Sequence, residues 1–303
     1  MKRTSTKFSF VFWRGMSNGF DICAVISIGG NDKTGQVLEL SLFPTDLLQR
    51  WEELTKHIPN DKYATSRRAA VYVKYMREKD ALLGVCPGTC EQLLSKKCYA
   101  QFNQHNAAQP ARIVHHVKTI PDFGLHLDVL TKAISTAKHL TTISKIRSMV
   151  VGDAGMFPMM TWLSIVSVFN QFFSLDQWLG YTHMWEAAPW LQPTHVASVD
   201  SAKEGGLAWS AGWSTFEGHT AVVETMPQGA VLCPGTKEFE RKNEFAFTCG
   251  GCPVACNGQS KPKRRISPRH GNGDASTKAA AGRRGITLKD HKGRIRGLYK
   301  VAA

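Results

Sequence analysis

The sequence has no apolar run that is both long enough to cross a membrane and free of polar interruptions. The nearest candidate is Met156–Phe173, where Pro158 and several Ser, Thr, Asn and Gln residues break the apolar character, as expected of a buried amphipathic helix. Near the N-terminus, Arg14 ends the apolar patch Phe8–Trp13 before it reaches the length of a signal-peptide core. We therefore expect a cytoplasmic protein that does not associate with membranes, whose thiols stay reduced rather than forming disulfides.

Three common signatures of nucleotide-binding proteins and hydrolases are also missing. The chain has no P-loop, no dinucleotide fingerprint and no nucleophile elbow. The pairs Gly29-Gly30 and Gly205-Gly206 are turn glycines that lack the strand–turn–helix context which such motifs require. Local motifs therefore do not identify a substrate.

Acidic residues are scarce at the end of the chain, where residues 260–303 hold two acids against 13 Lys and Arg and carry a net charge of +11. The remainder is nearly neutral, although the whole chain has a net charge of +14. Because apolar residues are too sparse here to build a core, we expect a basic, flexible tail over 259–303, with a short ordered element near Ile286–Val301. Such a tail would bind the phosphates of DNA or RNA without sequence specificity, through Lys261, Lys263, Arg264, Arg265, Arg283, Arg284, Arg294 and Arg296.

Seven of the eight cysteines gather in two groups, which is the strongest signal in the sequence. Both groups begin with Cys-Pro-Gly-Thr, and this clustering in a reduced protein predicts thiolate ligation of metal. The eighth cysteine, Cys23, stands alone in an apolar strand and is expected in the core. The first group is Cys86, Cys90 and Cys98, and the second is Cys233, Cys249, Cys252 and Cys256.

The second group has the spacing C-x15-C-x2-C-x3-C, and its four thiolates suffice to close a zinc site or to hold an iron–sulfur cluster. The first group, C-x3-C-x7-C, has only three thiolates. A histidine (His105, His115 or His116) could complete a zinc knuckle, or both groups could share one site. Alternatively, three thiolates leave one iron of a four-iron cluster open, as in radical S-adenosylmethionine enzymes, whose usual spacing is C-x3-C-x2-C.

The hydrophobic pattern divides the chain into three regions. Residues 1–80 are expected to form an α+β region, with strands at Phe8–Trp13, Ile22–Ile28 and Val37–Leu42 and helices at Thr45–His57 and Ser66–Glu78. Residues 81–258 alternate between short strands and helices, which predicts an α/β core with a parallel sheet. A partial or complete βα barrel is preferred, with a doubly wound open sheet as the competitor. The basic tail forms the third region, 259–303.

Within the α/β core we expect helices at Gly124–Ala137, Pro158–Phe172 and Ala202–Ala211. The expected strands are Arg112–Val117, Ser148–Val151, Trp178–Thr182, Val196–Val199, Ser214–Glu217 and Ala230–Leu232. His115 and His116 would then face opposite sides of a strand, so that at most one could point into a site.

Polar or ligating residues follow these strands at the points where they end. Asp153, His183 and Asp200 each come directly after a strand, Glu217 closes one, and Cys233 follows another. Ligands bind at the carboxyl ends of strands in parallel α/β folds. We therefore expect Asp153, His183 and Asp200 to bind substrate or to transfer protons.

The order of these motifs resembles that of uncharacterised phage and plasmid proteins of the "gene product 88" type. The resemblance covers about residues 80–258, and it implies a reduced radical-enzyme barrel with cysteine-bound metal in the cytoplasm of a host cell. In this chain Asp153 is followed by Ala154–Pro158, at the place where a Pro-containing loop is expected in relatives. The matching segments are Cys86–Cys90, Lys97–Ala100, Val150–Asp153, Leu179–Trp185, Ala197–Ser201, Gly212–Phe216, Cys233–Thr236 and Cys249–Cys256.

Two functions from different classes fit these observations. The first is a metal-dependent protein of a phage or plasmid, with iron–sulfur or zinc bound by the cysteines, that acts on or near nucleic acid. If this protein is a radical-type enzyme, Cys86, Cys90 and Cys98 would hold the reactive centre, with S-adenosylmethionine as a further cofactor. The second is a non-catalytic, zinc-stabilised protein that binds nucleic acid in replication or regulation, in which both cysteine groups are structural.

Overall fold

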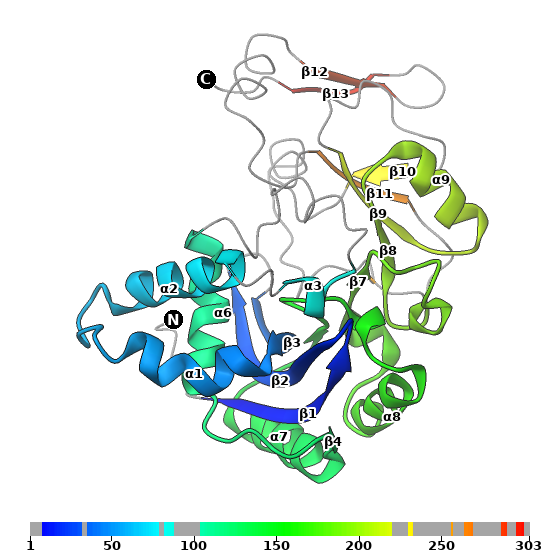
Figure 1. Cartoon of the computed structure of the whole chain (residues 1–303). Helices are drawn as coiled ribbons and strands as arrows, with labels where there is room; N and C mark the ends of the chain where they lie inside the picture. Colours follow the sequence, from blue (N-terminus) through cyan, green and yellow to red (C-terminus); the bar gives the residue numbers. More distant parts are fainter. Residues whose placement is uncertain are drawn as a thin grey trace.

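The computed structural model describes residues 8–31, 35–78, 82–87, 104–219, 230–232, 256, 264–268, 286–289 and 295–299 (Figure 1). The chain begins with three antiparallel strands, β1 (Ser9–Ser17), β2 (Phe20–Asn31) and β3 (Gly35–Pro44). β1 and β2 are joined by Asn18-Gly19, whose φ angles of 48° and 79° are those of the two-residue turn that matches strand twist. The three expected strands are confirmed, although Phe8 lies just before β1 and all three strands extend further than expected.

Helices follow the three strands. α1 (Thr45–Thr55) and α2 (Ala64–Glu78) confirm the two helices expected here, and the short α3 (Leu82–Val85) precedes the first cysteine group. α6 (Gln104–His116) packs against α2.

The strand expected at Arg112–Val117 is wrong, because these residues form the end of α6 and the stretch that follows it. Ala107, Ala111 and Val114 are all buried and recur at helical spacing, so packing against α2 outweighs the strand preference of β-branched residues. His115 and His116 accordingly lie in the last turn of a helix, with ring centroids 5.3 Å apart, and not on opposite faces of a strand.

The remaining part of the chain consists of short strands and three longer helices. The helices are α7 (Leu127–Leu140), α8 (Met159–Phe169) and α9 (Ala202–Ser210), close to their expected bounds. Single 3-10 turns occur at Ala154–Met156, Leu175–Gln177 and Pro189–Leu191. The strands are β4 (Gly124–Leu125), β5 (Ile146–Arg147), β6 (Trp178–Leu179), β7 (Tyr181–Thr182), β8 (Val196–Val199), β9 (Thr215–His219) and β10 (Ala230–Leu232).

These strands form two sheets. The first has the order β4-β1-β2-β3-β5-β6, in which β3, β5 and β6 are parallel, so the sheet crosses the expected boundary near residue 80. The second has the order β10-β11-β9-β8-β7 and is parallel throughout. The parallel-rich α/β fold is therefore confirmed, but the strands that the structure describes do not close a barrel.

Three strands lie in the region expected to be a flexible tail. β11 (Arg264–Pro268) is inserted between β9 and β10 and pairs with both in parallel. β12 (Ile286–Lys289) and β13 (Ile295–Tyr299) pair with each other in antiparallel fashion, at the place where a short ordered element was expected. Arg264 and Arg265 thus belong to a sheet rather than to a free tail.

Helices cover both faces of the first sheet. Glu39 and Leu179 pair with the same residue of β5, so their side chains lie on the same face of the sheet. Gln109 of α6 donates a hydrogen bond to Glu39, so α6 covers this face. Trp178 points to the opposite face and contacts Trp162 of α8, with ring centroids 5.7 Å apart. The parallel strands are therefore buried between helices, as parallel sheets usually are.

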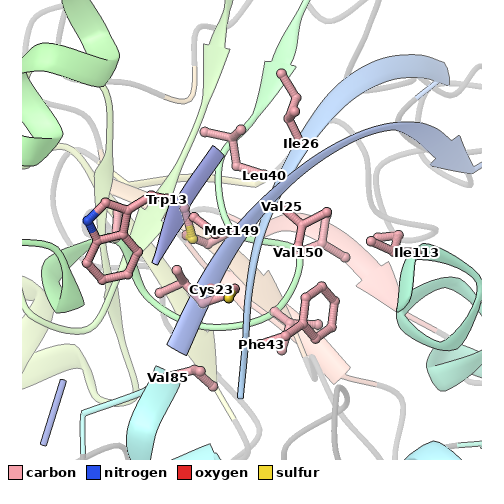
Figure 2. Close-up of a cluster of buried hydrophobic side chains, with 14 of the residues drawn as sticks. Trp13, Cys23, Val25, Ile26, Leu40, Phe43, Val85, Ile113, Met149 and Val150 are labelled. Carbon is pink, nitrogen blue, oxygen red and sulfur yellow. The ribbon is translucent and has the colours of Figure 1, made fainter. Parts of the chain in front are cut away.

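The buried cluster in Figure 2 joins the antiparallel strands to α3 and α6. Cys23 belongs to it and is fully buried, which confirms its expected place in the core. Its Sγ lies 3.1 Å from Thr45 Oγ1, and burial raises the pKa of the thiol to about 11. Cys23 therefore stays protonated at neutral pH, which makes it a poor metal ligand.

Gly180 is the single residue between β6 and β7, where the chain passes from the first sheet to the second. Its carbonyl accepts a hydrogen bond from Val196 N at 2.9 Å. A Cβ at this position would lie 2.6 Å from both Thr194 O and the His195 ring. The junction between the sheets therefore requires a residue without a side chain.

We predict that Gly180→Ala lowers the free energy of unfolding by about 1–3 kcal/mol, because neither the Thr194 carbonyl nor the packed His195 ring can move away easily. The matched control is Gly206→Ala in α9, where a Cβ meets no atom within 4 Å and the helix gains up to about 1 kcal/mol. Urea unfolding of both variants measures the difference. Equal stabilities of the two variants would contradict this account of the junction.

Candidate functional site

Asp153 lies where the chain leaves β5 at the carboxyl edge of the parallel strands. The strand expected at Ser148–Val151 is shorter than predicted, since β5 comprises only Ile146–Arg147 and Met149 has a left-handed φ of 56°. The chain nevertheless continues beside β3, with Val150 N donating to Leu40 O at 2.8 Å and Leu42 N donating to Val151 O at 2.9 Å. Asp153 therefore lies at the strand ends, as expected.

The carboxylate of Asp153 is buried and accepts three hydrogen bonds. Gly155 N and Thr182 Oγ1 donate to Oδ1 at 2.9 and 2.7 Å, and His183 N donates to Oδ2 at 2.7 Å. The Thr182 hydroxyl in turn accepts from Met184 N at 2.9 Å. The carboxylate therefore ties the 3-10 turn at Ala154–Met156 to the end of β7, and its orientation is fixed.

His183, which Asp153 holds through its backbone N–H, is partly accessible, with 28% of its side chain exposed. Its Nδ1 lies 4.0 Å from Asp153 Oδ2, and its Nε2 lies 3.2 Å from the Ser198 hydroxyl of β8. The imidazole therefore bridges the ends of β7 and β8, with a carboxylate on one side and a hydroxyl on the other. Two of the three predicted site residues, Asp153 and His183, are brought together in this way.

Asp200 lies at the same edge, two residues beyond Ser198. Its backbone N–H donates to Glu204 Oε2 at 3.0 Å, and Glu204 Oε1 accepts from Trp185 Nε1 at 3.3 Å. Glu204 is thus a residue that the sequence reasoning missed: it fixes the start of α9 next to the loop after His183. A glutamate three residues after the cap residue Ser201 is the signal that could have identified it.

Cys86 follows α3 and is partly exposed. The preceding residue, Val85, accepts a hydrogen bond through its carbonyl from Asp153 N at 2.9 Å. Gly152 has φ 90°, and a Cβ there would lie 2.9 Å from the same carbonyl, so a glycine is required for the two segments to meet. The first cysteine group therefore begins beside Asp153.

Cys256 is the only member of the second group within the described residues. It is buried against Val37 and Leu179, and its carbonyl accepts a hydrogen bond from Gly180 N at 3.3 Å. Within the described residues no group of three or more potential ligands is assembled. The other predicted metal ligands, Cys90, Cys98, Cys233, Cys249 and Cys252, lie outside the described residues.

Glu217 does not close its strand, as had been expected, because β9 continues to His219. It is fully buried and accepts a hydrogen bond from Thr215 Oγ1 at 3.1 Å. Glu217 is therefore a buried residue of the second sheet, where it pairs with Val199, the last residue of β8.

His195 is a second residue that the sequence reasoning missed. It is fully buried, its Nδ1 lies 2.9 Å from Thr194 Oγ1 and its Nε2 lies 2.9 Å from Ser148 Oγ. Its ring also packs edge-on against Trp162, with centroids 5.3 Å apart. Burial lowers the pKa of His195 to about 3, so the imidazole is neutral and supports the junction at Gly180.

Comparisons of the chain with protein-family models, with curated proteins and with solved structures found no match. None of the helices in the described part of the chain is long and apolar enough to span a membrane.

We predict that His195 makes the protein sensitive to acid. The pKa of His195 is lower in the folded protein than in the unfolded chain, so the unfolded chain gains a proton as the pH falls below about 6.5 and the folded state loses stability. Between pH 7 and pH 5 this group alone costs about 2 kcal/mol.

The measurement is the free energy of urea unfolding at both pH values. His195→Gln removes the titrating group and is expected to lose about 2 kcal/mol less than the wild type over this interval. His139→Gln, which removes an exposed histidine, is the control and keeps the wild-type pH dependence. The same pH dependence in His195→Gln as in the wild type would contradict the prediction.

Proposed function

We propose that this chain is a metal-dependent protein of a phage or plasmid, in which Cys86, Cys90 and Cys98 hold an iron–sulfur or zinc centre. The observation that carries the proposal is the 2.9 Å hydrogen bond from Asp153 N to the carbonyl of Val85. This bond fixes the start of the cysteine group at the edge of the sheet where the His183 ring is accessible. A metal bound by these thiolates would therefore lie close to groups that can transfer protons.

The residues on this edge suit different tasks in such a reaction. His183 is partly exposed and can accept or release a proton at Nε2. The carboxylate of Asp153 accepts hydrogen bonds from the Thr182 hydroxyl and the His183 backbone, and it positions the histidine rather than reacting itself. Asp200 directly follows the next strand, β8, and would bind substrate.

The bound group would supply chemistry that these side chains lack. An iron–sulfur cluster with one open iron provides an electron and a site for S-adenosylmethionine, whereas zinc polarises a bound water or carbonyl. Cys86 fits either group, because it is partly exposed and lies next to a fixed strand end. In contrast, Cys256 is buried at the sheet junction, which suits a structural centre formed with Cys233, Cys249 and Cys252.

A second candidate is a non-catalytic, zinc-stabilised protein that binds nucleic acid. The net charge of +11 over residues 260–303 favours it, because contacts to phosphates supply most non-specific affinity for DNA or RNA. In this case both cysteine groups would be structural and the groups around His183 would have no catalytic task.

We predict that protein purified without oxygen contains iron and is brown, with a broad absorbance near about 400 nm from thiolate-to-iron charge transfer. Cys86→Ser is expected to lose the iron of the first centre. The matched control is Cys23→Ala, which removes a fully buried thiol and keeps the wild-type metal content. Metal analysis and absorption spectra of the three proteins provide the measurement.

The metal that is found tests the iron–sulfur form of the proposal. A colourless protein with stoichiometric zinc would rule out an iron–sulfur centre, and zinc itself is compatible with either candidate. Protein without bound metal, or equal metal content in Cys86→Ser and Cys23→Ala, would contradict a centre at Cys86.

A further inference from the structure

Ser198 is a nucleophilic side chain to which neither the sequence analysis nor the proposed metal chemistry assigns a role. It lies in β8 and is partly exposed, and its Oγ is 3.2 Å from His183 Nε2. β7 and β8 are adjacent parallel strands, so their carboxyl ends deliver His183 and Ser198 to the same edge. A hydroxyl within hydrogen-bonding reach of an imidazole is the basic requirement for an activated serine.

A third group orients the base. Asp153 Oδ2 accepts the backbone N–H of His183 at 2.7 Å and lies 4.0 Å from Nδ1 of the same residue. Asp153 is itself held by Gly155 N and Thr182 Oγ1, so the carboxylate cannot turn away. The imidazole thus has a carboxylate next to Nδ1 and a hydroxyl next to Nε2, which is the order of acid, base and nucleophile in serine hydrolases.

We propose that Ser198 is a catalytic nucleophile for activated acyl esters, with His183 as its general base and Asp153 as the positioning residue. Ser198 Oγ forms a bond to the ester carbonyl carbon while its proton passes to His183 Nε2. The bond from carbon to the leaving oxygen then breaks, and His183 returns the proton to the departing alcohol. Water attacks the acyl-serine by the same route and releases the acid, so that one ester and one water give one acid and one alcohol.

The same protein contains a comparable pair that cannot react with a substrate. Ser148 and His195 are in hydrogen-bond contact at 2.9 Å, but both are buried from solvent. In contrast, His183 is 28% exposed and Ser198 is partly exposed. Ser148 therefore serves as an internal reference, because it has the imidazole contact without the access.

The arrangement does not depend on a bound metal, since all three side chains are held by hydrogen bonds within the chain. It also needs no nucleophile elbow, which the sequence lacks, because the serine comes from a strand beside its base rather than from a strand–helix turn. A failure of the metal proposal would therefore leave this inference intact, and the reverse is also true.

The test is covalent labelling of the full-length, folded protein with a fluorophosphonate, followed by peptide mapping by mass spectrometry. We expect one adduct, on Ser198, and no adduct on Ser148. His183→Gln should slow labelling by about 100-fold or more, because the general base is lost. Ser198→Ala should abolish it, and Ser167→Ala, which removes an exposed serine of α8, should leave the labelling rate unchanged.

Thermal melting of each variant establishes that it is folded before its rate is compared. If His183→Gln does not fold, the mapped adduct in the wild type and its absence in Ser198→Ala decide the question. An unlabelled Ser198 in the folded wild type, or an equal labelling rate in folded His183→Gln, would overturn the proposal.

Discussion

The edge of the sheet depends on the hydrogen bonds of Asp153, whose carboxylate is buried. The carboxylate accepts hydrogen bonds from the turn that follows it, from the Thr182 hydroxyl and from the backbone of His183. The backbone N–H of Asp153 donates to the carbonyl of the residue before Cys86. Hydrogen bonds to a charged group each contribute about 1.5–3 kcal/mol, and a buried carboxylate deprived of its donors is costly. Three segments distant in sequence are therefore held together by a single residue, through its side chain and its backbone N–H.

The junction at Gly180 complements this arrangement. The chain changes sheets there, and the space that a side chain would need is filled by the His195 ring and the Thr194 carbonyl. His195 is neutral and bonds to Ser148, which lies between β5 and Asp153 along the chain. Asp153 thus holds the end of β7, and His195 holds the segment that follows β5. The partly exposed imidazole of His183 lies at the strand end that Asp153 holds.

Much of this fold could be predicted from the pattern of apolar residues. The strands of the first region, α1, α2, and the alternation of β8, α9 and β9 follow from periodicity that is strong over several residues. The end of α6 could not, because Ile113 and Val114 favour strands and only the packing against α2 makes them helical. The pair Asn18-Gly19 is typical of a two-residue hairpin turn, so the turn between β1 and β2 could also have been predicted.

The candidate site was predictable only in part. Asp153 and His183 were found because polar residues at strand ends share an edge in a parallel sheet. Ser198 and His195 were missed, because their contacts with His183 and Ser148 join segments that are distant in sequence. Glu204 had a local signal in its spacing from the cap residue Ser201, which was not used. The insertion of β11 between β9 and β10 could not be predicted either, because the sequence of the basic region does not indicate which strands it pairs with.

The central claim is that the Asp153 carboxylate joins the strand ends, and a double-mutant cycle with Thr182 tests it most directly. Asp153→Asn, Thr182→Val and the double variant are compared with the wild type by urea unfolding. The account predicts a coupling energy of about 1–3 kcal/mol, because the 2.7 Å bond between these side chains is buried and charged. A coupling energy near zero would show that the two residues act independently, and it would contradict the account.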